Sequence, residues 1–226
     1  MAGADQQPLP IVVLISGRGS NLGAIIDATR RGELPVDIRA VISNRPDAAG
    51  ITISRRAGID TVVIDHACHF DRASFDAALQ TTIDSFEPGL VVLAGFMRIL
   101  TPGFVDHYRG RLINIHPSLL PEFPGLNTHQ RVIDAGREVT GATVHFVTPE
   151  ADAGPAFLQV HVAVRTDDSA ETLAGRVLNA EHRLYPEAIR MVAEGRIALD
   201  NDDTVTLDGA PLESVPLLGS AVATGT

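Results

Sequence analysis

The stretch Ile11-Val12-Val13-Leu14-Ile15, followed by Gly17-Arg18-Gly19-Ser20-Asn21, decides the fold of this chain. A continuous apolar run that is mostly β-branched predicts a strand buried on both faces, which is typical of a parallel sheet. The glycines then turn the chain, and Leu22, Ile25 and Ile26 follow with helical spacing. This strand, turn and helix predict the first unit of an α/β protein.

The same alternation continues into the middle of the chain. Short apolar runs predict further strands at residues 38–42, 61–64 and 90–94. Helical patterns lie between them: one follows a turn at residues 44–47 and runs to about residue 58, and the other covers residues 70–86. Strands and helices that alternate in this way predict a doubly wound, mostly parallel sheet.

The second half of the chain predicts a different arrangement. Strands are expected at residues 141–147 and 157–164, and the short turn-rich loop between them indicates an antiparallel pair. A long helix is expected from Ser169, and Pro186 should kink it or divide it in two. The predicted fold class is therefore α/β, with antiparallel strands added to the parallel sheet in the C-terminal half.

No linker or internal repeat divides the sequence, so we expect a single domain over residues 10–210. Residues 205–209 predict a terminal hairpin. The remaining segments are small and polar, which predicts a disordered N-terminus over residues 1–9 and a flexible tail over residues 211–226.

Composition excludes several classes of function. All 18 basic residues are arginines, which excludes chemistry that needs a lysine, such as a Schiff base or a P-loop. The net charge of -10 argues against nucleic acid as a partner. The single cysteine, Cys68, indicates a reducing compartment. With no signal-peptide pattern and no apolar run near the roughly 20 residues that span a bilayer, we expect a cytoplasmic protein without membrane contact.

The segment Asn114-Ile115-His116, just before Pro117, is the first candidate for chemistry. Side chains alternate along a strand, so the amide of Asn114 and the imidazole of His116 should point the same way. Such a pair can donate hydrogen bonds to an oxyanion and move a proton. The alternative is a capped turn beside an ordinary loop histidine.

The loop of residues 17–21 is a candidate anion site, because backbone N–H groups at a helix N-terminus bind anions. A dinucleotide site does not fit, since Leu22 occupies the third glycine position and no acidic residue ends the second strand. A single phosphate is therefore the better ligand. The alternative is a tight turn in which Ser20 or Asn21 caps the helix.

Two further segments could complete a site. Asp152 lies in a loop flanked by glycine and proline, where its carboxylate could orient His116, although an Asx-turn is the simpler explanation of this residue taken alone. Residues 97–100 follow a strand end, where open α/β sheets bind ligands, and could line a slot for a flat heterocycle or simply pack in the core. The spacing of potential ligands at residues 65–71 matches no zinc pattern, so no metal is expected.

Taken together, these segments resemble the glycinamide ribonucleotide (GAR) formyltransferases, also called phosphoribosylglycinamide formyltransferases. The resemblance covers residues 10–208. It is carried by residues 12–22, 91–100 and 114–121, by Pro124-Gly125, and by residues 144–147 and 152–155.

The resemblance implies an enzyme of de novo purine synthesis that moves a formyl group from 10-formyltetrahydrofolate, its co-substrate, to the amine of GAR. It implies two small-molecule partners and a monomer or homodimer. The catalytic residues that it implies are Asn114, His116 and Asp152. The GAR-binding residues that it implies are Gly19, Ser20, Asn21, Pro117 and Glu181. The folate-binding residues that it implies are Arg72, Met97, Arg98, Ile99, Leu100, Thr148, Pro149, Glu150 and Ala151.

The chain departs from the family pattern at three positions. Asn127 stands where histidine is common, and Glu122 replaces a commonly basic residue. Ala153 replaces a glycine, so we expect a stiffer loop there, because alanine adopts positive φ less easily. The competing functions on the same scaffold are formyltetrahydrofolate deformylase and a non-catalytic folate-binding protein. Methionyl-tRNA formyltransferase fits less well, because it usually carries an additional C-terminal domain.

Overall fold

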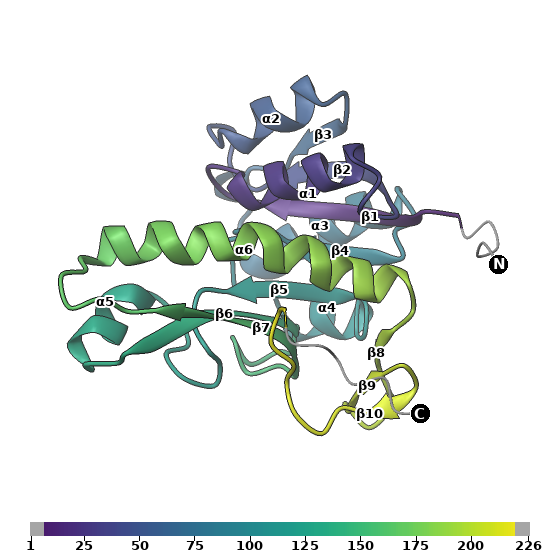
Figure 1. The fold of residues 1–226 in the computed structure, drawn as a ribbon. Coiled ribbons are helices and arrows are strands. Elements are labelled where there is room, and N and C mark those ends of the chain that lie inside the picture. Colours follow the sequence, from purple (N-terminus) through teal and green to yellow (C-terminus); the bar gives the residue numbers. More distant parts are fainter. Residues whose placement is uncertain (1–6, 220–226) are drawn as a thin grey trace.

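The computed structural model describes residues 7–219 of the chain. Its centre is a seven-stranded sheet in the order β3-β2-β1-β4-β5-β6-β7 (Figure 1). Strands β1 to β5 are parallel, whereas β6 and β7 join antiparallel. This arrangement confirms the predicted fold class. The strands are β1 (Leu9–Ile15), β2 (Val36–Ser43), β3 (Asp60–Val63), β4 (Leu90–Leu93), β5 (Leu112–His116), β6 (Val139–Phe146) and β7 (Ala156–Ala163).

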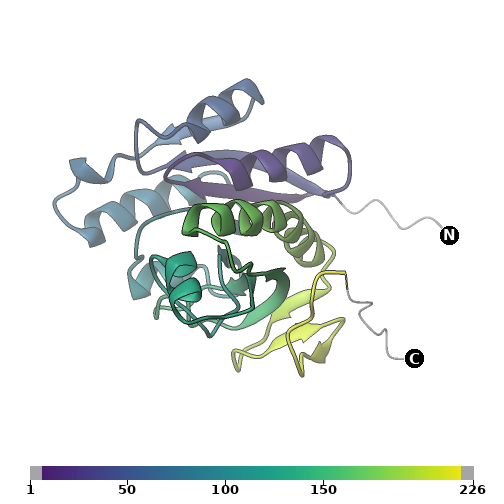
Figure 2. The same ribbon diagram turned by 60° about the vertical axis from the view of Figure 1, so that its left-hand side comes forward.

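Helices cover both faces of the sheet. Helices α1 (Ser20–Arg30) and α6 (Ala170–Ala193) lie side by side on one face, as Figures 1 and 2 show. Helices α3 (Arg72–Asp84) and α4 (Pro102–His107) pack on the other face. The remaining short elements are α2 (Gly50–Arg56), the 3-10 turn η1 (His66–Cys68) and α5 (Thr128–Asp134).

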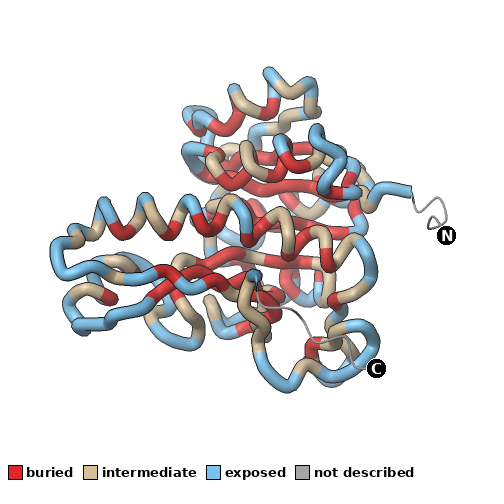
Figure 3. The backbone as a smooth tube through the Cα atoms, in the orientation of Figure 1, coloured by how far each residue is buried: buried red, intermediate tan, exposed pale blue. Residues whose placement is uncertain are grey.

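Each face of the sheet has its own hydrophobic core. Along β1, Ile11, Val13 and Ile15 belong to the core under α1 and α6, whereas Val12 and Leu14 belong to the core under α3 and α4. Most residues of the central strands β1, β4 and β5 are therefore buried, as the red tube in Figure 3 shows. Burial on both faces explains why these strands have continuous apolar sequences.

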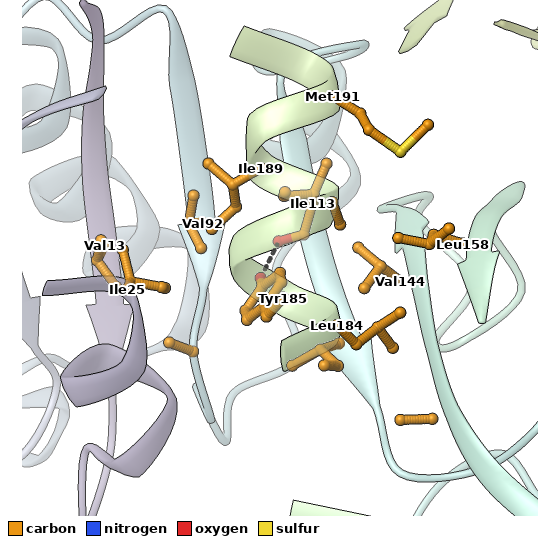
Figure 4. Packing of buried hydrophobic residues seen from close by; sticks show 14 of the residues in the cluster. Val13, Ile25, Val92, Ile113, Val144, Leu158, Leu184, Tyr185, Ile189 and Met191 are labelled. Carbon is orange, nitrogen blue, oxygen red and sulfur yellow. Dashed lines mark hydrogen bonds between the residues drawn. The ribbon is translucent and has the colours of Figure 1, made fainter. Parts of the chain in front are cut away.

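Helix α6 is anchored to the sheet by apolar side chains and one buried hydroxyl. Leu184 and Ile189 pack toward β4 and β5 (Figure 4). The hydroxyl of Tyr185 donates to the carbonyl of Leu93 at 2.9 Å and lies 3.3 Å from that of Ile113. The helix runs through Pro186 without interruption, with buried residues on both sides of it. Of the two expected effects of this proline, a kink or a division, the division is therefore wrong.

Other element boundaries also differ from the prediction. The helix expected after the turn at residues 44–47 is α2, which begins only at Gly50, because turns continue through residue 49. Helix α4 was not predicted, since six residues are too few to show a helical period. None of the helices between residues 7 and 219 combines the length and apolarity that crossing a bilayer requires.

The ends of the domain extend beyond their predicted limits. Strand β1 begins at Leu9, which lies in the segment expected to be disordered. A second sheet contains β8 (Ile197–Leu199), β9 (Val205–Leu207) and β10 (Ala210–Pro211), which confirms the hairpin. Beyond it, backbone hydrogen bonds join Gln159 on β7 to Pro216 and Leu218, so the tail is held to the sheet there. The rest of the predicted terminal segments, residues 1–6 and 220–226, lies outside the described residues.

Candidate active site

Two adjoining cavities lie at the carboxyl ends of the parallel strands. The glycine-loop cavity, of about 600 Å³, is lined by residues 16–21 and by Glu181. The apolar cavity, of about 800 Å³, is lined by residues 96–100 and by the loop that carries Asp152. The residues that line both cavities are Gly95, Met97, Arg98, Ile115, Pro117 and His129.

The glycine loop leaves the start of α1 without a side-chain cap. The N-cap residue is Gly19, with φ of 74°, and no side-chain hydrogen bond caps the helix. A Cβ on Gly19 would lie 2.6 Å from the Cα of Gly50, so only glycine fits this close approach. The alternative in which Ser20 or Asn21 caps the helix is therefore wrong. Uncapped N–H groups that border a cavity can bind an anion.

A buried polar pair lies beside this loop. The side-chain amide of Asn21 donates to the carboxylate of Glu181 at 2.7 Å, and both residues are more than nine-tenths buried. The Oδ1 atom of Asn21 has no partner among the described residues. Burial raises the pKa of Glu181, against the opposing effects of the Asn21 hydrogen bond and the charge of Arg18. Such a pair can bind ligand hydroxyl groups.

The three predicted catalytic residues meet in the apolar cavity. The Nδ1 atom of His116 lies 3.4 Å from Oδ2 of Asp152, and its Nε2 atom donates to the carbonyl of Phe123 at 3.0 Å. Both ring nitrogens thus face oxygen acceptors, an arrangement that suits the doubly protonated imidazolium. Asn114 lies on the same side of β5 as His116, as the strand alternation predicts.

His145 on β6 fixes the amide of Asn114. Its Nδ1 atom donates to the carbonyl of Phe146 at 2.9 Å, so its Nε2 atom is left to accept from the amide of Asn114 at 3.3 Å. Burial lowers the pKa of His145, which favours this neutral form. The second N–H of the Asn114 amide then remains available to a ligand in the apolar cavity.

Asp152 connects two loops. Its Oδ2 atom also accepts from the backbone N–H of Gly125 at 2.8 Å, which joins the loop after β6 to the loop after β5. Asp152 has φ of 55°, in the left-handed region, whereas Ala153 does not. The alanine at position 153 is therefore not forced into a positive φ, because the left-handed residue is the aspartate itself.

The predicted folate residues lie on two walls of the apolar cavity, with two exceptions. Residues 97–100 form one wall, where the guanidinium of Arg98 lies 5.5 Å from the ring of Phe75. Residues 148, 149 and 151 form the other. Arg72 and Glu150 line neither cavity, and Arg72 is exposed at the start of α3.

Several residues of the site were not predicted. His129 lines both cavities, and its Nδ1 atom is buried without a hydrogen-bond partner among the described residues. Burial, with the nearby charge of His116, lowers the pKa of His129. Isolated histidines and a serine carry no pattern that reveals such neighbours, so the sequence offered no signal for His129 or for Ser16.

The remaining departures from the family pattern are accommodated locally. Asn127 is the N-cap of α5 with φ of 54°, a conformation that asparagine tolerates, and it lines the apolar cavity. Glu122 forms an exposed ion pair with Arg137 and lines neither cavity. Within the part of the chain that the structure describes, no group of three or more potential ligands is arranged to hold a metal ion.

Comparisons with known proteins find relatives that match most of the chain. The family model described as Formyl transferase matches residues 9–189. The phosphoribosylglycinamide formyltransferase of Escherichia coli is 48% identical over 202 residues, which cover 89% of this chain and 95% of that protein. The human trifunctional purine biosynthetic protein adenosine-3 is 45% identical over 201 residues, which cover 89% of this chain and 20% of that protein.

Solved structures also superimpose closely on this fold. The phosphoribosylglycinamide formyltransferase of Coxiella burnetii has a TM-score of 0.87 and 52% sequence identity, covering 91% of this chain and 96% of that one. A glycinamide ribonucleotide transformylase from Symbiobacterium toebii has a TM-score of 0.86 and 44% identity, covering 90% and 95%. Because the family match and these relatives extend over most of the sequence, the chain belongs to the formyl transferase family of enzymes.

Proposed function

We propose that this chain transfers the formyl group of 10-formyltetrahydrofolate to the amine of GAR. The observation that carries the proposal is the position of Asn114, His116 and Asp152 beside the wall that the two cavities share. A donor in one cavity and an acceptor in the other would meet at these side chains. The names and high identity of the relatives support the same reaction.

The two cavities differ in the chemistry of their walls, and this difference supports the assignment of one substrate to each cavity. The phosphate of GAR would bind the open N-terminus of α1 at Gly19 and Ser20. The ribose hydroxyls would bind Asn21 and Glu181. The flat ring system of the folate would enter the apolar cavity along residues 97–100.

In the proposed reaction the substrate amine attacks the formyl carbon, and the carbonyl oxygen becomes an oxyanion. The free N–H of Asn114 would donate to this oxygen. His116 would donate as well, by exchanging one of its present acceptors for the substrate oxygen. The bond from carbon to the folate nitrogen then breaks, and that nitrogen receives the proton lost by the amine. Asp152 would stabilise the imidazolium during this transfer.

The identity of the formyl donor, a cytoplasmic location and a monomeric or dimeric state belong to this proposal. A small folate and a small ribonucleotide match the sizes of the two cavities. The single exposed thiol, Cys68, is compatible with a reducing compartment.

A product assay separates the proposed function from its alternatives. The purified protein is mixed with 10-formyltetrahydrofolate, and formation of tetrahydrofolate is followed by absorbance with and without GAR. Product that requires GAR supports transfer. Product without GAR would instead identify a deformylase, and no product in either mixture would indicate a folate-binding protein.

Substitutions test the residues assigned to the oxyanion. Removing one oxyanion donor typically lowers kcat by roughly 10²–10³-fold. We expect losses of about this size for Asn114→Ala and His116→Ala. The exposed His161 provides a control, since His161→Ala should keep the wild-type kcat. Near-full turnover by either active-site variant would refute the assignment.

A further inference from the structure

One wall of the apolar cavity is a segment without regular secondary structure, residues 97–100. Two of its side chains are strongly exposed, with Met97 at 71% and Ile99 at 58%. The amides of Arg98, Ile99 and Leu100 donate no hydrogen bond to any described residue. A surface with so few contacts of its own can bind a ligand in one geometry only if its ends are held.

The N-terminal end of this segment is held by Ser16. The hydroxyl of Ser16 accepts from the backbone N–H of Met97 at 2.7 Å and donates to Oδ1 of Asn44 at 2.6 Å. Ser16 is 6% exposed and Asn44 is 2% exposed, so both bonds are shielded from water. The loops after β1, β2 and β4 are thereby joined through one hydroxyl.

The C-terminal end is held by Asp76. This residue lies on α3 and is 3% exposed, yet no described residue forms an ion pair with it. Its Oδ2 atom accepts from the backbone N–H of Thr101 at 2.6 Å, directly before α4. A carboxylate buried without a counter-ion is costly, which indicates that its position has a use beyond packing.

We infer that Ser16 and Asp76 are positioning residues that hold the segment from Met97 to Thr101 in the shape that binds the folate. Neither side chain lines the apolar cavity. They act by fixing the two ends of the wall, so that the segment between them keeps one shape. The identification of the ligand as a folate rests on the proposed function.

Kinetics of Ser16→Ala and Asp76→Ala test this inference. One lost hydrogen bond corresponds to roughly a two- to tenfold change in an equilibrium constant. We expect the KM for 10-formyltetrahydrofolate to rise by about that factor in each variant. In Asp76→Ala the KM for GAR should stay within about twofold of wild type, because Asp76 does not line the glycine-loop cavity. An equal rise of both KM values in this variant would overturn the inference.

Two matched variants separate positioning from a general loss of stability. Asp76→Asn keeps an acceptor oxygen for Thr101, so its KM for the folate should be close to that of wild type. If the negative charge were required instead, the KM would stay as high as in Asp76→Ala. Ser54→Ala removes another buried serine whose hydroxyl bonds only Ile51 and Thr61 near α2. Its folate KM should equal that of wild type, and a rise like that of Ser16→Ala would contradict the inference.

Hydrogen exchange gives a measurement that does not depend on turnover. In the unliganded protein, the amide of Met97 should exchange about two- to tenfold faster in Ser16→Ala, and that of Thr101 in Asp76→Ala. Suppose that amide exchange becomes faster in the variants while neither the variants nor the wild type transfers a formyl group. In that case the proposed function fails, but the positioning role of Ser16 and Asp76 is supported. If the wild type is active but the amide exchange rates and the folate KM are both unchanged in the variants, the positioning role of Ser16 and Asp76 is refuted.

Discussion

At the scale of single residues, the candidate site depends on side chains with two contacts each. Asp152 faces His116 and also accepts from the N–H of Gly125. Its left-handed backbone conformation is one that aspartate and asparagine tolerate better than most residues. The backbone and the carboxylate can therefore be tested separately.

We expect Asp152→Asn to lower kcat by roughly 10²-fold, since the amide cannot stabilise the imidazolium of His116. Its stability should match wild type, because asparagine keeps both the backbone conformation and an acceptor for Gly125. Asp152→Ala should lose about 1 kcal/mol of unfolding free energy as well. Steady-state kinetics and urea unfolding of the two variants measure these effects. Wild-type kcat in Asp152→Asn would contradict the proposed role.

Glu181 is expected to lower the stability of the folded protein and to strengthen the binding of GAR. Burial raises its pKa, so the folded protein holds this proton to higher pH than the unfolded chain, and the contribution of Glu181 to the unfolding free energy falls as pH rises above about 4.3. Glu181→Gln should therefore be more stable than wild type at pH 7, yet have a KM for GAR about tenfold higher. Urea unfolding at pH 5 and pH 7 with kinetics of GAR saturation checks both. A variant less stable than wild type at pH 7 would contradict this account.

At the scale of elements, the site is built by loops that follow strand ends. The loops after β1 and β4 supply the glycine loop and the wall of residues 97–100, whereas Asn114 and His116 lie at the end of β5 itself. The sequence predicts these strands well, because burial on both faces produces long apolar runs. It predicts α2 and α4 poorly, because a helix of six or seven residues shows less than two full periods.

The loop between β6 and β7 requires a glycine at one position. A Cβ on Gly154 would lie 1.8 Å from the carbonyl oxygen of Phe146 and 3.3 Å from Nδ1 of His145. We expect Gly154→Ala to cost about 1–3 kcal/mol of unfolding free energy. It should also lower kcat, because His145 orients Asn114.

Thermal unfolding and kinetics of Gly154→Ala measure these two losses. The control is Gly175→Ala in α6, where nothing lies within 4 Å of the new Cβ. Alanine in an exposed helix position should raise stability by about 0.5–1 kcal/mol. Equal behaviour of the two variants would show that the close contact at Gly154 is relieved without cost.

The extent to which the site could be predicted also has a physical basis. Alternation along a strand places Asn114 beside His116, so their common direction could be predicted. Other contacts of the site join segments that are far apart in the sequence. They are the contact of His116 with Asp152 and the hydrogen bonds of Ser16 and Asp76 to the ends of the segment 97–101. Such contacts depend on how loops fold over the sheet, and a local pattern contains no information about them.

At the scale of the whole molecule, buried and half-buried histidines contribute to the response to acid. Burial lowers the pKa of His129, His145 and His182 below the usual value of about 6.5. As pH falls through 6.5, the unfolded chain binds protons that the folded protein does not. The unfolding free energy should therefore fall between pH 7 and pH 5.5.

Urea unfolding between pH 5.5 and pH 7 measures how the unfolding free energy depends on pH. His182 lines neither cavity, and its Nε2 atom is buried without a partner in the described residues. His182→Gln should thus flatten the slope and leave kcat unchanged. Greater stability at pH 5.5 than at pH 7, or a slope unaffected by His182→Gln, would contradict this assignment.

The C-terminal segment has a consequence for the behaviour of shortened forms of the protein. Strand β7 lies at one edge of the seven-stranded sheet, and Pro216 and Leu218 occupy backbone hydrogen bonds of Gln159 on that edge. An uncovered edge strand offers its backbone to strands of other molecules. Cutting the chain before Pro216 would therefore expose the backbone of β7 to pairing with strands of other molecules. Aggregation, rather than loss of catalytic activity, would then limit the use of such a truncated enzyme.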